Sequence, residues 1–69
     1  MIHLSPRHHQ IVELVAKGFS YPKVAKRLGI HHETVRTHVR VIVKRLNSDE
    51  PPRIAMCAYY LQWTRTQGL

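Results

Sequence analysis

The sequence predicts an all-α fold, a compact four-helix domain that contains a helix-turn-helix. Residues that start or cap helices precede the apolar segments, and apolar residues recur at helical spacing along the chain. In residues 24–39, moreover, Ala25, Gly29 and Val35 follow one another at intervals of four and six. A small residue allows two helices to approach closely, and a glycine adopts the left-handed conformation that ends a helix. This spacing therefore predicts a tight turn between two packed helices.

Serine and proline mark where the helices begin, and glycine marks where they end. Ser5 and Pro6 start the first helix, because serine caps free N–H groups and proline lacks the N–H that would be unpaired there. Ser20 caps the second helix, and Gly18 and Gly29 end the first and the second. We expect one domain over residues 1–69, with helices at about 6–17, 21–28, 32–46 and 52–63.

The third segment carries apolar and basic residues on opposite faces. Its β-branched residues would also suit a strand, but its length, its four-residue apolar spacing and the lack of a partner strand favour a helix. The apolar stripe consists of Val35, Val39, Ile42 and Leu46. Arg36, Arg40 and Lys44 recur every fourth residue on the opposite face. A helix of this kind next to a tight turn is suited to entering a DNA groove.

Positive charge is concentrated in the predicted helix-turn-helix. The chain has eleven Lys and Arg against four Asp and Glu, a net charge of +7. Residues 23–45 contribute +6 of this charge, because they hold seven basic residues and one acidic residue, Glu33. The basic residues are Lys23, Lys26, Arg27, Arg36, Arg40, Lys44 and Arg45. Such clustering predicts a polyanionic partner, most commonly a nucleic acid, although a solvated basic surface would share this composition.

Length and composition limit the other classes of protein. Sixty-nine residues can build one small core, which is marginal without a staple or a partner. Cys57 is the sole cysteine, so no disulfide can form within the chain, and a lone thiol suits a reducing compartment. The sequence has no signal-peptide pattern and no apolar run of about 20 residues that could span a membrane. We therefore expect a cytoplasmic protein without membrane contact.

The predicted fourth helix is apolar on two neighbouring faces. The face expected to contact the core consists of Ile54, Cys57, Ala58 and Leu61. The neighbouring face consists of Met56, Tyr59, Tyr60 and Trp63. Because so small a core can hardly cover both, we expect the aromatic face to be exposed and to form a homodimer interface. In the alternative, the aromatic residues fold back over the first helix.

Four stretches of the chain resemble the LuxR/GerE family of helix-turn-helix DNA-binding domains. They are LSPR at residues 4–7, IVELVAKGFS at 11–20, VAKRLGI at 24–30 and TVRTHVRVIVKRL at 34–46. The resemblance implies transcriptional regulation in bacteria or their phages, with the third helix in the major groove and the fourth paired across a two-fold axis. The receiver or ligand-sensing domain of larger members has no counterpart in these residues. We therefore expect any signal to arrive through expression level, a partner or pH.

The resemblance also implies which residues contact DNA. Base contacts are implied for Arg36, Thr37 and Arg40. Phosphate contacts are implied for Thr34, Lys44 and the start of the second helix, where Lys23 lies. Arg45 joins the phosphate contacts because of its charge near the end of the third helix. Each base-contacting arginine could donate two hydrogen bonds to guanine and the threonine could contact a thymine methyl, or the arginines could contact phosphates alone.

The chain departs from the family pattern at several helix ends. His8 stands where members usually have an acidic residue, and His31 stands at the cap of the third helix where they usually have Ser or Thr. Before the fourth helix the chain has Asn47 where members tend to have glycine. The resemblance therefore constrains the register of the fourth helix least.

No metal or cofactor site is predicted. The pairs His8-His9 and His31-His32 are adjacent, so their side chains diverge by about 100° on a helix, and Cys57 has no second cysteine. An alternative role for these histidines is to gain charge below about pH 6.5 and strengthen DNA binding. An enzyme is not expected, because the chain has four carboxylates, no glycine-rich phosphate loop and a cysteine on a predicted core face.

We expect double-stranded DNA as the main partner and sequence-specific regulation of transcription as the function. The alternative is a protein-interaction module with weak DNA binding of its own. Such a module would be a domain like sigma region four that acts within an RNA polymerase complex, or an anti-regulator that pairs with a larger regulator. The intact basic face argues against the anti-regulator, since such a protein need not keep it.

Overall fold

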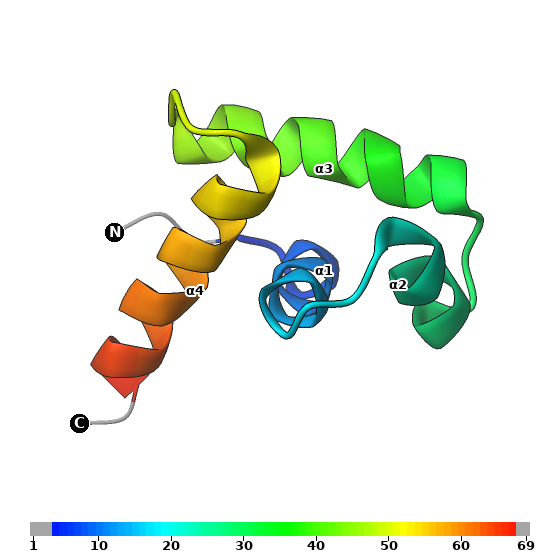
Figure 1. The fold of residues 1–69 in the computed structure, drawn as a ribbon, viewed down its shortest axis with the longest axis horizontal. Helices are drawn as coiled ribbons and strands as arrows, with labels where there is room; N and C mark the ends of the chain where they lie inside the picture. The colour runs from blue at the N-terminus through cyan, green and yellow to red at the C-terminus, as the bar shows by residue number, and fades with distance from the viewer. Residues whose placement is uncertain (1–3, 68–69) are drawn as a thin grey trace.

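Four helices make up the fold of residues 4–67, the part of the chain that this computed structural model describes. They are α1 (Pro6–Ala16), α2 (Tyr21–Leu28), α3 (His32–Leu46) and α4 (Pro52–Gln67). Figure 1 shows α1 between α2 and α4, with α3 lying across them. Residues 4–67 contain no strand, so the predicted all-α, four-helix fold is confirmed.

Side chains cap three of the helices at their N-termini. The Ser5 and Ser20 hydroxyls cap α1 and α2, each accepting a hydrogen bond from the N–H three residues on, at 3.3 and 3.4 Å. His31 caps α3, because its Nδ1 accepts a hydrogen bond from the Glu33 N–H at 3.2 Å. Each cap satisfies one of the free N–H groups at a helix start. His31 thus takes the place of the Ser or Thr of the family pattern.

Left-handed residues end α2 and α3. Gly29 ends α2 with a φ of 68°, and Asn47 ends α3 with a φ of 50° and a ψ of 47°. Asparagine is one of the few residues besides glycine that adopt this conformation readily. The Asn47 N–H donates to the carbonyls of Val43 and Lys44 at 3.1 and 3.2 Å. Asn47 therefore ends the helix as the glycine of the family pattern would.

Two helix ends differ from those predicted. α1 ends at Ala16, one residue earlier, and Gly18 follows with a φ of 96°. α4 continues to Gln67, beyond the predicted end near Trp63. Neither glycine nor proline occurs between Trp63 and Gln67, so nothing in the sequence ends the helix at the predicted position.

Buried residues from all four helices form one small core. They are Ile11, Val12, Val15, Val24, Ala25, Val35, Val39, Ile42 and Met56. Within residues 4–67, no polar or charged side chain is buried. Full burial of a Val, Ile or Met side chain stabilises a fold by about 1.5–3 kcal/mol. Each core side chain is therefore a large part of the stability of so small a domain.

The predicted orientation of α4 is wrong. Met56, expected on an exposed face, is fully buried. Ile54 and Leu61, expected in the core, are 53% and 60% exposed. Tyr59 and Tyr60 are half-buried and pack against the core. The aromatic residues thus fold back over the rest of the domain, which is the alternative interpretation of the sequence.

Polar contacts with α1 and with the segment that follows it hold α4 in its observed orientation. The Arg53 guanidinium donates to the carbonyls of Val15 and Phe19, both at 3.2 Å. The Tyr60 hydroxyl donates to the Glu13 carboxylate of α1 at 3.1 Å. Since Arg53 and Tyr60 lie about two turns apart, both contacts hold the same face of α4 against α1. Met56 lies on that face between them and is therefore buried.

Candidate nucleic-acid interface

The turn between α2 and α3 has the geometry of a helix-turn-helix. Ala25 and Val35 are 4% and 0% exposed where the two helices pack together. The left-handed Gly29 lets the Ile30 N–H donate to the Ala25 carbonyl at 3.0 Å, which closes α2. A Cβ atom at Gly29 would meet nothing within 4 Å, so glycine serves the backbone conformation and not a close approach. Ala25, Gly29 and Val35, the residues whose spacing predicted the turn, therefore determine its geometry.

α3 separates its apolar and basic residues as predicted. Its buried residues are Val35, Val39 and Ile42. Its exposed residues include Arg36, Thr37, Arg40 and Lys44. In Figure 1 no other helix covers the outer side of α3. α3 therefore has a free basic face, and the major groove of B-DNA is wide enough to admit one such helix.

The two arginines and the threonine of this face differ in whether they already bond to other groups of the protein. Within residues 4–67, neither Arg36 nor Arg40 forms an ion pair. Each guanidinium offers five donors in a planar fork, which fits guanine O6 and N7 or a phosphate. The Thr37 hydroxyl, in contrast, donates to the Glu33 carbonyl at 3.1 Å. Thr37 therefore has no free hydroxyl proton, and it can offer DNA its methyl group and the acceptor lone pairs of its oxygen.

The residues predicted to contact phosphate lie at both ends of α3 and on α2. Lys23 is exposed in the first turn of α2, and Thr34 is exposed in the first turn of α3. Lys44 and Arg45 are exposed in the last turn of α3, where positive side chains also suit the helix dipole. One residue turns a helix by about 100°, so the side chain of Arg45 diverges from that of Lys44.

Two histidines and an acidic residue stand at the N-terminus of α3. The rings of His31 and His32 stack with their centroids 5.8 Å apart. His32 Nε2 is 3.6 Å from a carboxylate oxygen of Glu33, whose side chain is 67% exposed. His31 Nδ1 can accept the capping hydrogen bond only while it carries no proton. The cap of α3 therefore uses the lone pair of His31 Nδ1.

A further histidine pair joins α1 to α3. His8 Nε2 and His38 Nδ1 are 3.0 Å apart, and the two rings meet edge to face. Burial, and then the neighbouring charges of His38 and Arg45, lower the pKa of His8 below its usual 6.5. The partners are 30 residues apart, so no local spacing in the sequence indicates this pair.

The four residues predicted to form a dimer interface lie against α1 and the core. Met56 is fully buried, and Tyr59 is half-buried. The ring centroid of Trp63 is 4.3 Å from that of His9 and 5.8 Å from that of Tyr60. Burial, and then the hydrogen bond to Glu13, raise the pKa of Tyr60 above its usual 10.0. The Tyr60 hydroxyl therefore keeps the proton that it donates to Glu13.

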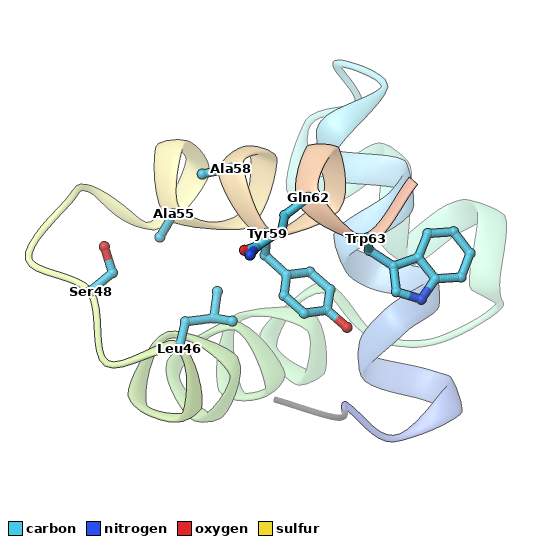
Figure 2. A pocket seen from close by; sticks show the side chains of 7 residues that line it. All are labelled: Leu46, Ser48, Ala55, Ala58, Tyr59, Gln62 and Trp63. Atoms are coloured by element: carbon cyan, nitrogen blue, oxygen red, sulfur yellow. The ribbon is translucent and has the colours of Figure 1, made fainter. Parts of the chain in front are cut away.

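The exposed side of α4 carries a different apolar stripe. We define the α4 stripe as Ile54, Cys57, Ala58 and Leu61, of which Cys57 is half-buried and the others are exposed. Beside it, a groove of about 350 Å³ lies between the end of α3 and α4, and Figure 2 shows the side chains that line it. These belong to Leu46, Ser48, Ala55, Ala58, Tyr59, Gln62 and Trp63. The stripe and the groove together form a mainly apolar surface on α4 and the end of α3.

The described part of the chain offers few other kinds of site. Among residues 4–67, no three His, Cys, Asp or Glu side chains gather closely enough to hold a metal ion. No helix in this range has the length and apolar content needed to cross a membrane.

The chain is similar in sequence to a family of bacterial proteins. Residues 3–58 match the family GerE, described as bacterial regulatory proteins of the luxR family. Over 43 residues the chain is 37% identical to the nitrate/nitrite response regulator protein NarL of Escherichia coli K12, and equally to that of Escherichia coli O6:H1. This stretch is 62% of the chain and 20% of NarL, so the chain spans about one fifth of these relatives. No solved structure matches the chain significantly.

Proposed function

This chain belongs to the LuxR family of bacterial regulatory proteins as a helix-turn-helix DNA-binding domain, and we propose that it regulates transcription by binding a specific double-stranded DNA sequence. The observation that carries the proposal is the exposed basic face of α3. The packed turn at Ala25 and Val35 holds this face in a fixed position. Such a helix fits the major groove, where base edges differ between all four base pairs.

Base selection is assigned to three residues of α3. Arg36 and Arg40 each donate a pair of hydrogen bonds to guanine O6 and N7, a contact that contributes roughly 1–3 kcal/mol of discrimination. The Thr37 methyl contacts the methyl group of thymine, since its hydroxyl proton is already used within α3. Phosphate contacts are assigned to Lys23, Thr34, Lys44 and Arg45. These contacts fix the register of the protein on DNA without selecting a sequence.

In this proposal the domain binds as a homodimer paired through the α4 stripe. Ile54 and Leu61 are 53% and 60% exposed and lie about two turns apart on one face, which favours a protein contact. A two-fold axis at α4 sets two α3 helices about 10 bp apart on DNA. One short helix buries less than the roughly 1,600 Å² of a standard interface. DNA therefore completes the dimer, because two linked half-sites raise the effective concentration of the second subunit.

Selection from random duplex DNA tests this function. The purified chain is expected to enrich an inverted repeat with guanines in each half-site, and sedimentation of the selected duplex should show two chains bound. A variant carrying Arg36→Ala and Arg40→Ala is expected to enrich no motif. A variant carrying Arg7→Ala and Arg65→Ala, exposed positions on α1 and α4, matches this change in charge and should retain the motif. Failure of the wild-type chain to enrich any motif at low salt would contradict the proposed function.

A further inference from the structure

The basic face of α3 contains one acidic residue. Glu33 is the sole acid among residues 23–45. At about 100° per residue, Glu33 shares an arc of about 60° with Thr37, Arg40 and Lys44. All four of these residues are exposed, and the Glu33 side chain is 67% exposed. Glu33 therefore stands among the residues assigned to DNA, one turn before Thr37.

Within the described residues, no contact of the Glu33 side chain requires an acidic residue at this position of α3. Its ion-pair partner is the adjacent His32 ring, 3.6 Å away and itself 44% exposed. The hydrogen bond that Thr37 donates goes to the backbone carbonyl of Glu33, so any residue at this position would accept it. A glutamate in the first turn also favours the helix dipole. An acidic residue at position 32 or 34 would interact with the helix dipole equally well and would lie outside the arc.

A carboxylate inserted into the major groove discriminates strongly between bases. It accepts hydrogen bonds and donates none, and phosphates repel it. Guanine presents two acceptors in this groove, and thymine presents an acceptor and a methyl group. Adenine has a donor with the N7 acceptor beside it, whereas cytosine presents the N4 amino donor without such a neighbour. Cytosine is therefore the base that a carboxylate tolerates best.

We infer that Glu33 is a specificity-determining residue that accepts a hydrogen bond from the N4 amino group of one cytosine in each half-site. Glu33 is the second residue of α3, and the N-terminal residues of a recognition helix are those that contact base edges. The cytosine lies beside the base pairs that Arg36 and Thr37 contact. Because this role requires α3 in the major groove, it rests on the proposed function.

Parallel selections with the wild-type chain, Glu33→Gln and Glu33→Ala test this role. The wild-type chain is expected to select a C·G pair at one position of each half-site. Glu33→Gln is expected to shift that position toward adenine, because glutamine pairs with adenine N6 and N7. Glu33→Ala is expected to lose the preference there and to keep it elsewhere. On fixed duplexes, its discrimination against replacement of that cytosine should fall roughly fivefold or more.

Glu50→Gln is the matched control, since it removes one negative charge in the exposed segment before α4. It is expected to leave every selected position unchanged. If Glu33 acts only on the helix dipole, both Glu33 variants lower the melting temperature and the affinity for all duplexes alike, with an unchanged motif. That result would overturn the inference and leave the proposed function standing, whereas a wild-type chain without any motif would overturn both. Circular dichroism identifies a variant that fails to fold, and Glu33→Gln, which keeps the side-chain shape, then decides the question.

Discussion

The His8 Nε2 atom on α1 lies 3.0 Å from the His38 Nδ1 atom on α3. One imidazole donates a hydrogen bond to the other, which requires that at least one ring be neutral. With both rings protonated, neither could accept this hydrogen bond and the two like charges would repel each other. We therefore expect the contact between α1 and α3 to weaken in acid.

Mild acid is expected to destabilise the domain through this pair. The pKa of His8 is lower in the folded chain than its unfolded value of 6.5, so the unfolded chain binds the proton more readily. The stability that the neutral ring contributes is present above pH 6.5 and is lost as the pH falls through the lowered folded-state pKa. The melting temperature, measured between about pH 8 and pH 5, should fall on the acid side of this range.

The variant His38→Gln tests the same pair, because its amide can hydrogen-bond but does not titrate. Its melting temperature is expected to depend less on pH than that of the wild-type chain. His32→Gln removes an exposed imidazole from the same helix and serves as the control. Identical pH dependence in all three chains would show that the pair does not link stability to pH.

Arg53 is expected to stabilise the docking of α4 on α1. Its guanidinium donates to two carbonyls, those of Val15 and Phe19, and lies over the ring of Tyr21. Arg53→Lys cannot make both hydrogen bonds in this geometry and should lower the free energy of unfolding by about 1–2 kcal/mol. Urea denaturation measures this loss, with Arg65→Lys near the end of α4 as the control. Equal stability of the two variants would mean that the paired hydrogen bonds of the Arg53 guanidinium do not stabilise the docking of α4.

Met56 and Leu61 are expected to respond to truncation in opposite ways. Met56 is fully buried and Leu61 is 60% exposed. Met56→Ala should lower the free energy of unfolding by about 2–5 kcal/mol, because it leaves a cavity in a small core. Leu61→Ala should change it by no more than about 0.5 kcal/mol. Chemical denaturation of both variants therefore tests the observed orientation of α4, and a larger loss for Leu61→Ala would favour the orientation predicted from the sequence.

The α4 stripe is expected to control cooperative DNA binding and not folding. A variant with Ile54→Gln and Leu61→Gln should melt as the wild-type chain does and bind an isolated half-site equally well. Its cooperative binding to two half-sites should be lost, because the second subunit no longer meets an apolar partner. Arg65→Gln, also on α4, is the control. Unchanged cooperativity in the stripe variant would exclude this face as the dimer interface.

Cys57 provides an independent probe of the same face. It lies on the α4 stripe between Ile54 and Leu61, and its thiol is free. If the two-fold axis crosses α4 here, a short thiol-specific cross-linker should join two chains on a duplex with both half-sites. Cys57→Ser should abolish this product, and the stripe variant should reduce it. Cross-linking that is equally efficient without DNA would indicate a dimer that forms before DNA binding.

The helix-turn-helix could be predicted from the sequence because its determinants are local. Ser20 and Gly29 lie at the ends of α2, and the spacing of Ala25 and Val35 identifies the turn itself. The basic face of α3 is likewise determined by residues four apart, which helical geometry places together. No long-range contact is needed for any of these features.

The orientation of α4 and the histidine pair could not be predicted in this way. α4 is apolar on two faces, so its periodicity does not decide which face is buried. The contacts that hold the observed face in place include those of Arg53, which donates to carbonyls 38 and 34 residues earlier in the chain. His8 and His38 also meet only through the packing of α1 on α3. Such contacts follow from the tertiary fold and have no signature in local spacing.

The affinity of the chain for its selected duplex and for an unrelated duplex, measured as a function of salt, tests DNA recognition most directly. Binding to both should weaken with salt, with a log–log slope of about −0.9 for each neutralised phosphate. Arg36→Ala or Arg40→Ala is expected to cost roughly 1–3 kcal/mol on the selected duplex and much less on the unrelated one. Lys44→Ala should weaken both duplexes alike. Absence of binding at low salt, or arginine variants that bind the selected duplex as tightly as the wild-type chain, would contradict recognition of DNA by α3.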